Sequence, residues 1–331
     1  MGLRFGWTAA LALVLGAPMA LACWSAPPPS LGLAGEVVYI RNDQLYLFSL
    51  NSREERKLVE LPAGAVAKDP VWSPDLQRIV FAMYPPPQRG VPPGTDLYSV
   101  RRDGSDLRLL RQHEVAGEML ESPYFLPDGK SIVFSRFAPI MSGGQYQGDV
   151  IEILRLDLAT GATTPLVKEG ILPTVSVDGT QLAFVRLNPQ TAAQSLWLAT
   201  IDGTHQRQLV AEDQFAAIYW PRFSPDGRTL AFAGAAIPSI GRWFPRGAPA
   251  GLARPAQHGL PNDVYTVRVE GSKPTLVAKL AEDDPTPLWS ADGQRLLVIG
   301  AQAFYAVAPD GSNLVRLREP GGVGGGDWRG K

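Results

Sequence analysis

One short motif recurs along the chain and limits its possible folds more than any other feature. In its first copy, Pro70 is followed by Val-Trp-Ser and then by Pro74 and Asp75. Every copy has a proline five residues before its aspartate and an aliphatic residue four residues after it. The aspartates of the five copies are Asp75, Asp128, Asp178, Asp226 and Asp292. Registers kept over five copies indicate a protein built from structural repeats.

Each repeat contains four short apolar segments separated by turn sequences. A typical closing turn is Asp103-Gly104-Ser105, where glycine accepts the positive φ that a tight hairpin needs. Four antiparallel strands per unit indicate a blade of a β-propeller. The aspartates are 53, 50, 48 and 66 residues apart by subtraction, which fits blades, the last with an insertion. A β-sandwich is the alternative for so many strands, but it has no reason to repeat one motif.

The two ends of the chain together supply one further blade. Residues 36–61 contain three strands without a first, and Trp328 near the C-terminus can be aligned with Trp72 of the motif. We therefore predict an all-β fold, a six-bladed β-propeller of four-stranded antiparallel blades over residues 36–331. The C-terminal segment is expected to be the inner strand of the first blade, which leaves no open sheet edge.

The N-terminus has the pattern of a targeting segment. Residues 1–22 combine Arg4 with an apolar stretch and a small-residue cleavage site, as in a signal peptide. Cys23, the single cysteine, follows at once. It is either a lipidated first residue of a lipoprotein or a free thiol after ordinary cleavage. Residues 23–35 form a proline-rich linker. We expect an exported protein, periplasmic or at the cell surface, attached to a membrane through lipidated Cys23.

Composition and motifs exclude several classes of function. The 31 Lys and Arg residues against 32 Asp and Glu residues give a net charge of −1, so nucleic-acid binding is not expected. The chain has no Gly-x-Ser-x-Gly nucleophile motif and no His-Glu-x-x-His metal motif. We expect no catalytic residues, no metal and no cofactor. The three histidines, His113, His205 and His258, are expected to be solvated turn residues, and the five motif aspartates to hold turns.

The repeat resembles that of the TolB-like propeller family, which is related to WD40-like repeats. The clearest copies are Phe223-Ser-Pro-Asp-Gly227 and Trp289-Ser-Ala-Asp-Gly293, each followed by a short apolar strand. The resemblance covers residues 36–331 and implies the fold. It implies little about function, since one fold serves many functions. TolB has a further N-terminal domain, for which this chain is not expected to have room.

The longest interruptions of the repeat lie between second and third strands, at residues 84–94, 137–148 and 235–262. In a propeller these loops share one face, as expected of a binding surface on a rigid scaffold. The last insertion contains residues of the types enriched at protein interfaces. These candidates for partner binding are Arg242, Trp243, Phe244 and Arg246. The alternative is that Trp243 and Phe244 cover the edge of their own blade.

Charged and aromatic residues precede each inner strand and should ring the mouth of the central channel. The acidic and basic candidates are Lys68, Asp69, Glu121, Asp283 and Asp284. Tyr219 and Trp220 are further candidates for partner binding. Such a ring suits a sugar, a peptide or a cation, although solvated rim residues would have the same sequence pattern.

The sequence therefore predicts a non-catalytic binding propeller that captures an envelope protein through its long-loop face. The alternative is a carbohydrate- or peptide-binding propeller, or an enzyme of this kind that uses carboxylates at the channel mouth.

Overall fold

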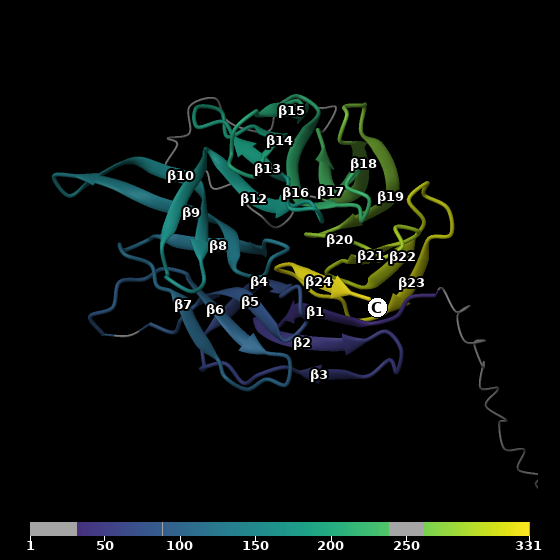
Figure 1. The fold of residues 1–331 in the computed structure, drawn as a ribbon, viewed down its shortest axis with the longest axis horizontal. Coiled ribbons are helices and arrows are strands. Elements are labelled where there is room, and N and C mark those ends of the chain that lie inside the picture. Colours follow the sequence, from purple (N-terminus) through teal and green to yellow (C-terminus); the bar gives the residue numbers. More distant parts are fainter. Residues whose placement is uncertain (1–31, 88, 238–260, 331) are drawn as a thin grey trace, which may run out of the picture. The chain divides into compact units, whose positions relative to one another are not determined.

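The computed structural model describes residues 32–87, 89–237 and 261–330, which form one compact unit. Within these ranges all regular elements are β-strands, and they form six four-stranded antiparallel sheets. The sheets are arranged as blades around a centre (Figure 1). This is the predicted six-bladed β-propeller.

Each blade runs from an inner strand at the centre to an outer strand at the rim. In that order, blade 1 comprises β24 (Gly326–Arg329), β1 (Glu36–Arg41), β2 (Gln44–Ser49) and β3 (Glu55–Lys57). Blade 2 comprises β4 (Val66–Trp72), β5 (Arg78–Tyr84), β6 (Asp96–Arg101) and β7 (Arg108–Arg111). Blade 3 comprises β8 (Met119–Phe125), β9 (Ser131–Ser142), β10 (Gln145–Asp157) and β11 (Thr163–Lys168). Blade 4 comprises β12 (Gly170–Val175), β13 (Gln181–Leu187), β14 (Gln194–Thr200) and β15 (Arg207–Val210). Blade 5 comprises β16 (Phe215–Phe223), β17 (Thr229–Ala236), β18 (Asn262–Arg268) and β19 (Thr275–Glu282). Blade 6 comprises β20 (Thr286–Trp289), β21 (Leu296–Ile299), β22 (Phe304–Val307) and β23 (Val315–Arg318).

The core lies between neighbouring blades. Second strands such as β5 are apolar on both faces, because each blade is covered by a neighbour on either side. Outer strands such as β7 are largely exposed and carry arginines. Trp72 of the motif is buried against Val38 and Leu45 of blade 1, so this aromatic residue packs between two blades.

The ring is closed by the C-terminal strand, as predicted. β24 pairs with β1 in antiparallel register, with Trp328 opposite Val37. The Trp328 side chain is buried, and its indole N–H donates to the Ala34 carbonyl at 2.9 Å. The two ends of the propeller thus share one sheet.

The motif aspartates hold turns between first and second strands. Asp226 accepts hydrogen bonds from Ser224 Oγ at 2.6 Å and from the Arg228 N–H at 3.0 Å. The first of these bonds is the main reason that the pKa of Asp226 lies below its ordinary value. The same arrangement recurs at Asp75, Asp178 and Asp292. The structural interpretation of these aspartates is confirmed.

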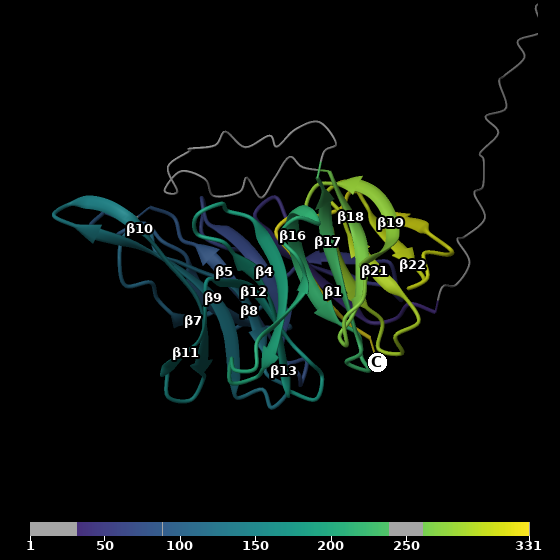
Figure 2. The ribbon, with the colours of Figure 1, turned by 90° about the horizontal axis from the view of Figure 1, so that it is seen from above.

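The prediction of an irregular loop is wrong for one segment. Residues 137–148, expected to be irregular, extend β9 and β10 into a long hairpin that projects beyond blade 3 (Figures 1 and 2). Cross-strand pairing continues to Ser142 and Gln145, and Gly143 and Gly144 form the turn with positive φ. This segment, residues 138–151, is called the arm below. The predicted signal peptide, Cys23 and most of the insertion in blade 5 lie outside the described residues, so these assignments stay predictions.

Candidate functional site at the central channel

Four inner strands have a β-bulge just before the motif proline. In blades 2 to 5 the residue before this proline has positive φ, and the pairing register with the second strand shifts at the same place. The four residues are Asp69 (φ 54°), Ser122 (φ 53°), Leu172 (φ 53°) and Trp220 (φ 52°). Non-glycine residues adopt this conformation only where the surrounding structure enforces it. Each bulge bends its strand and redirects a side chain at the channel.

Two of these bulge residues are joined by a carboxylate. Asp69 Oδ2 accepts hydrogen bonds from the Ser122 N–H at 2.7 Å and from Ser122 Oγ at 3.1 Å. The Asp69 N–H in turn donates to the Gly324 carbonyl at 2.7 Å. Asp69 therefore links blades 2 and 3 to the segment that leads into β24.

Asp284 makes the corresponding links on the other side. Its Oδ1 accepts from the Trp220 indole N–H at 2.5 Å, and its Oδ2 accepts from the Gly324 N–H at 3.0 Å. Asp284 and Trp220 are both buried. The contacts form a chain of hydrogen bonds from Trp220 through Asp284, Gly324 and Asp69 to Ser122, which we call the channel latch.

Burial perturbs both carboxyl groups of the latch. Desolvation, with a smaller contribution from the charge of Glu121, raises the pKa of Asp69 to about 7. Burial likewise raises the pKa of Asp284 to about 7, although hydrogen bonds from Trp220 and Gly324 favour its charged form. Both groups therefore titrate near neutral pH.

The remaining residues predicted at the channel mouth lie beside the latch. Lys68 Nζ is 3.5 Å from Glu121 Oε1, and the Glu121 side chain is buried. Burial, and then the charges of Asp284 and Asp283, raise the pKa of Tyr219 to about 12. The Tyr219 hydroxyl is buried and has no hydrogen-bond partner among the described residues.

The structure thus brings the predicted mouth residues together, but many of them bind one another rather than face solvent. Trp220, Asp284 and Glu121 are each less than 8% exposed. Their role in binding stays a prediction. Arg242, Trp243, Phe244 and Arg246 lie outside the described residues, so the other part of the predicted site also stays a prediction.

Sequence reasoning missed a second group in the channel, formed by Tyr124, Arg222 and Arg329. The Arg222 guanidinium carbon lies 5.4 Å from the Tyr124 ring centre, although their strands are separated in the ring by β12. A signal was present. Arg329 stands where four of the five motif copies carry serine, and Arg222 stands where other copies carry Val71, Thr174 or Leu288.

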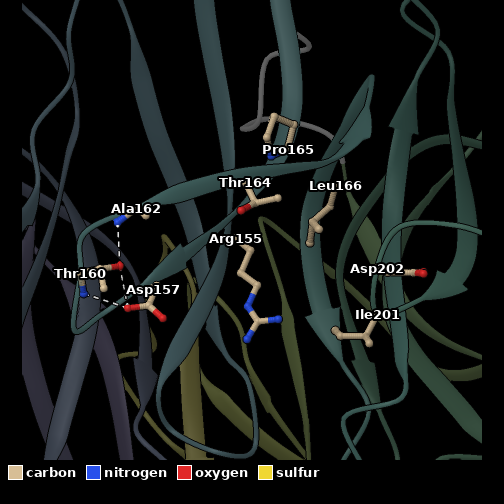
Figure 3. Close-up of a pocket in the computed structure, with 9 residues that line it drawn as sticks. All are labelled: Arg155, Asp157, Thr160, Ala162, Thr164, Pro165, Leu166, Ile201 and Asp202. Carbon is tan, nitrogen blue, oxygen red and sulfur yellow. Dashed lines mark hydrogen bonds between the residues drawn. The ribbon is translucent and has the colours of Figure 1, made fainter.

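A surface pocket of about 520 Å³ lies away from the channel, at the outer edge between blades 3 and 4 (Figure 3). Asp157 accepts hydrogen bonds from the Thr160 N–H and hydroxyl within its own turn (Figure 3). Asp202 is held in the same way by Thr200 and Thr204. Arg155 donates to Ser131 at 3.0 Å. Because these polar groups already have partners, we assign the pocket no chemistry.

One expectation about the histidines is wrong. His113 is buried rather than solvated, with Nδ1 2.6 Å from Asp96 Oδ1 and Nε2 2.9 Å from the Pro92 carbonyl. It fixes the loop between β5 and β6. His205 is exposed, as expected, and His258 lies outside the described residues.

Among the residues that the structure describes, no three metal-ligating side chains are grouped to hold an ion. None of the described segments is a helix long and apolar enough to span a membrane.

Comparison with known proteins supports the fold. No family model matches the chain, and no curated protein matches its sequence. Among solved structures, TolB from Acinetobacter baumannii is similar with a TM-score of 0.62 at 17% identity, over 89% of this chain and 66% of that one. The present chain therefore spans slightly less than two thirds of that TolB. A TolB-type protein from Agrobacterium tumefaciens is similar with a TM-score of 0.54 at 16% identity, over 86% of this chain and 87% of that one.

A third similar structure has a lower sequence identity. A chain of a nidogen/laminin complex is similar with a TM-score of 0.63 at 9% identity, over 88% of this chain and 97% of that one. The fold and the closed ring define a six-bladed β-propeller. Within that class, the fold is similar to that of the solved TolB structures.

Proposed function

We propose that the chain is an exported, non-catalytic binding propeller that captures a protein partner through the face bearing the arm. The observation that carries the proposal is the apolar surface of the arm. Its exposed large side chains are Ile140 (45%), Met141 (55%), Tyr146 (41%) and Val150 (36%). Isolated exposed apolar residues are common, but a cluster on a projecting ribbon is typical of an interaction site.

The backbone of the arm offers a second means of binding. β8 pairs with β9 only as far as Phe137, and β11 pairs with β10 only from Glu152 onward. Residues 138–142 and 145–150 are therefore paired with each other but have no outer strand among the described residues, while the Ile151 carbonyl accepts from the Glu169 N–H at 2.7 Å. Such strand edges accept an extended segment of another protein through main-chain hydrogen bonds. The arm has one charged residue, Asp149, so an apolar extended segment suits it best.

The comparisons agree with this proposal but do not identify the partner of this chain. One similar structure is described as a nidogen/laminin complex, so a propeller of this kind occurs in a complex between proteins. The signal-peptide pattern supports export, and lipidation of Cys23 would attach the propeller to a membrane. The insertion with Arg242, Trp243, Phe244 and Arg246 follows a second strand, as the arm does, and is proposed to extend the same surface.

Pull-down from detergent-solubilised envelopes tests the arm. We expect the double variant Met141→Asp and Tyr146→Asp to lose the partner and to keep the melting temperature of the unmodified protein. The matched control is Val177→Asp. Val177 is 59% exposed in the turn between β12 and β13, at the opposite end of the blades from hairpins such as β9–β10. Retention of the partner by the double variant would contradict the proposal, as would its loss in the control.

The insertion in blade 5 is tested separately. Replacement of Trp243 and Arg246 with alanine should also remove the partner without unfolding the ring. Retained pull-down would restrict the binding surface to the arm.

A second candidate function is a propeller that binds a glycan or peptide, or acts on one, at the channel mouth. It is favoured by the pKa values of about 7 at Asp69 and Asp284, since groups that titrate near neutral pH suit acid–base chemistry. A thermal-shift screen against glycans and peptides tests it. A reproducible shift that is lost in Asp284→Asn would favour this function over partner capture alone.

A further inference from the structure

The channel contains a layer of polar residues next to the latch, on the C-terminal side of the motif proline. The residue after the motif proline is Tyr124 in blade 3, Thr174 in blade 4 and Arg222 in blade 5. In blade 1 the aligned residue is Asp327, two positions before Arg329. All lie on inner strands, so these residues come together only when the ring is formed.

Arg222 is a cation without an anionic partner in the described part of the chain. Its Nη1 donates to the carbonyl of Pro221 at 3.1 Å, on its own strand. Its Nε is buried and makes no hydrogen bond with any described residue. The guanidinium carbon lies 5.4 Å from the Tyr124 ring centre and 5.8 Å from that of Trp220. Stacking on rings orients the guanidinium, but leaves its buried N–H unsatisfied, which is unusual in folded proteins.

Arg329 lies on β24, two positions after Asp327 of this layer. Its Nε is 3.5 Å from Asp327 Oδ2, beyond normal hydrogen-bond length, and is also buried without a hydrogen bond to any described residue. The Asp327 carboxylate accepts from the Trp72 N–H at 2.9 Å and from the Trp328 N–H at 3.0 Å. The charge of Asp327, and then Tyr124, raise the pKa of Arg329 above its ordinary value.

The site is partly exposed. The Arg329 side chain is 38% exposed, and Tyr124 and Arg222 are half-buried, while Asp327 is 7% exposed. The latch residues Asp69, Ser122 and Trp220 precede the motif prolines, toward the N-terminal end of the inner strands. Arg329 lies at the C-terminal end of its inner strand, so the latch does not separate it from solvent at that end.

The charges of the layer select the kind of ligand. Two guanidinium groups and one carboxylate leave a surplus of one positive charge, which matches a monoanion. Guanidinium groups bind planar carboxylates through paired N–H donors, and aromatic rings favour a ligand with a flat apolar body. Thr174 Oγ1 is also buried and has no hydrogen-bond partner among the described residues. It lies on β12, between the strands of Tyr124 and Arg222, and offers one more hydrogen-bonding group.

We propose that Arg222 and Arg329, with the rings of Tyr124 and Trp220, form a binding site for one carboxylate group attached to an aromatic or apolar body. The site is independent of the arm and of the proposed partner surface. It assigns the channel a small-molecule ligand, in addition to any protein captured on the other face.

Isothermal titration of the full chain with benzoate tests the site, with benzamide as the neutral probe of equal shape and inorganic phosphate as a tetrahedral anion. We expect saturable binding of benzoate, and at least tenfold weaker binding of benzamide and of phosphate. Arg222→Gln should weaken benzoate binding at least tenfold. Arg222→Lys should also weaken it, because lysine keeps the charge but lacks the planar fork. Arg155→Gln, which removes an arginine from the outer edge of blade 3, is the matched control and should bind as the unmodified protein does.

Several results would overturn the proposal. They are absence of saturable benzoate binding up to about 10 mM, equal affinity for benzamide or phosphate, and unchanged affinity in Arg222→Gln. If Arg222→Gln fails to fold, Arg329→Gln provides the second variant, and the comparison of the three probes on the unmodified protein still decides.

Discussion

The closing strand provides the sharpest test of the fold, through the substitution Trp328→Ala. Trp328 is 5% exposed and packs with Val37 and Leu288, so one side chain joins the first and last blades. Its indole N–H also donates to the Ala34 carbonyl, which would lose its partner. Truncation of a buried tryptophan to alanine destabilises a protein by about 3–5 kcal/mol.

The expected change in melting temperature follows from the size of the protein. For a domain of this length, 1 kcal/mol lowers the melting temperature by roughly 2 °C, so Trp328→Ala should lower it by roughly 6–10 °C. Deletion of residues 320–331 removes β24 altogether and should lower it further. Thermal unfolding followed by circular dichroism measures both.

A matched substitution separates closure from the general loss of a large side chain. Trp197 lies on β14, the third strand of blade 4, and is only partly buried, so Trp197→Ala should destabilise the protein less. A melting temperature of Trp328→Ala within about 2 °C of the unmodified protein would refute the reasoning, because the two ends of the ring would then contribute nothing to its stability.

Three further predictions concern polar contacts. Asp69 has a folded pKa of about 7, above its ordinary value of 3.8, so its contribution to stability is full at low pH and is lost as pH rises through 7. Asp69→Asn does not ionise, and its melting temperature relative to the unmodified protein should therefore rise from about pH 5 to about pH 8; a constant difference would show that Asp69 titrates elsewhere. Asp226→Ala removes a turn acceptor and should lower the unfolding free energy by about 1 kcal/mol, measured with urea, without affecting partner pull-down; loss of pull-down would give this aspartate a functional role. His113→Ala leaves the buried Asp96 carboxylate without its ring partner and should lower the unfolding free energy by about 2–3 kcal/mol, whereas a change below about 0.5 kcal/mol would mean that the loop between β5 and β6 does not depend on it.

Many residues of the candidate site could be predicted from the sequence. Lys68, Asp69, Tyr219, Trp220 and Asp284 were expected at the channel mouth because inner strands converge there. Their hydrogen bonds were not predictable, since the partners of Asp284 come from blade 5 and from the segment before β24. Nor did local sequence reveal the positive φ of Trp220, because the bulge depends on pairing with β17.

The arm shows where local pattern fails. Residues 137–148 contain Pro139 and several glycines, which are usual in loops, yet they extend β9 and β10 in register. The pairing is stabilised by continuation of an existing hairpin, whose geometry is set by buried residues further down the strands.

By itself, the sequence determined the blades, their number and the closing strand, because the turns and the inner-strand aromatics are local features repeated at a fixed register. Only the tertiary structure decided which polar groups meet in the channel. Arg222, Tyr124 and Arg329 are separated by about one hundred residues at each step along the chain. They come together only because six blades form a closed ring whose inner strands share one axis.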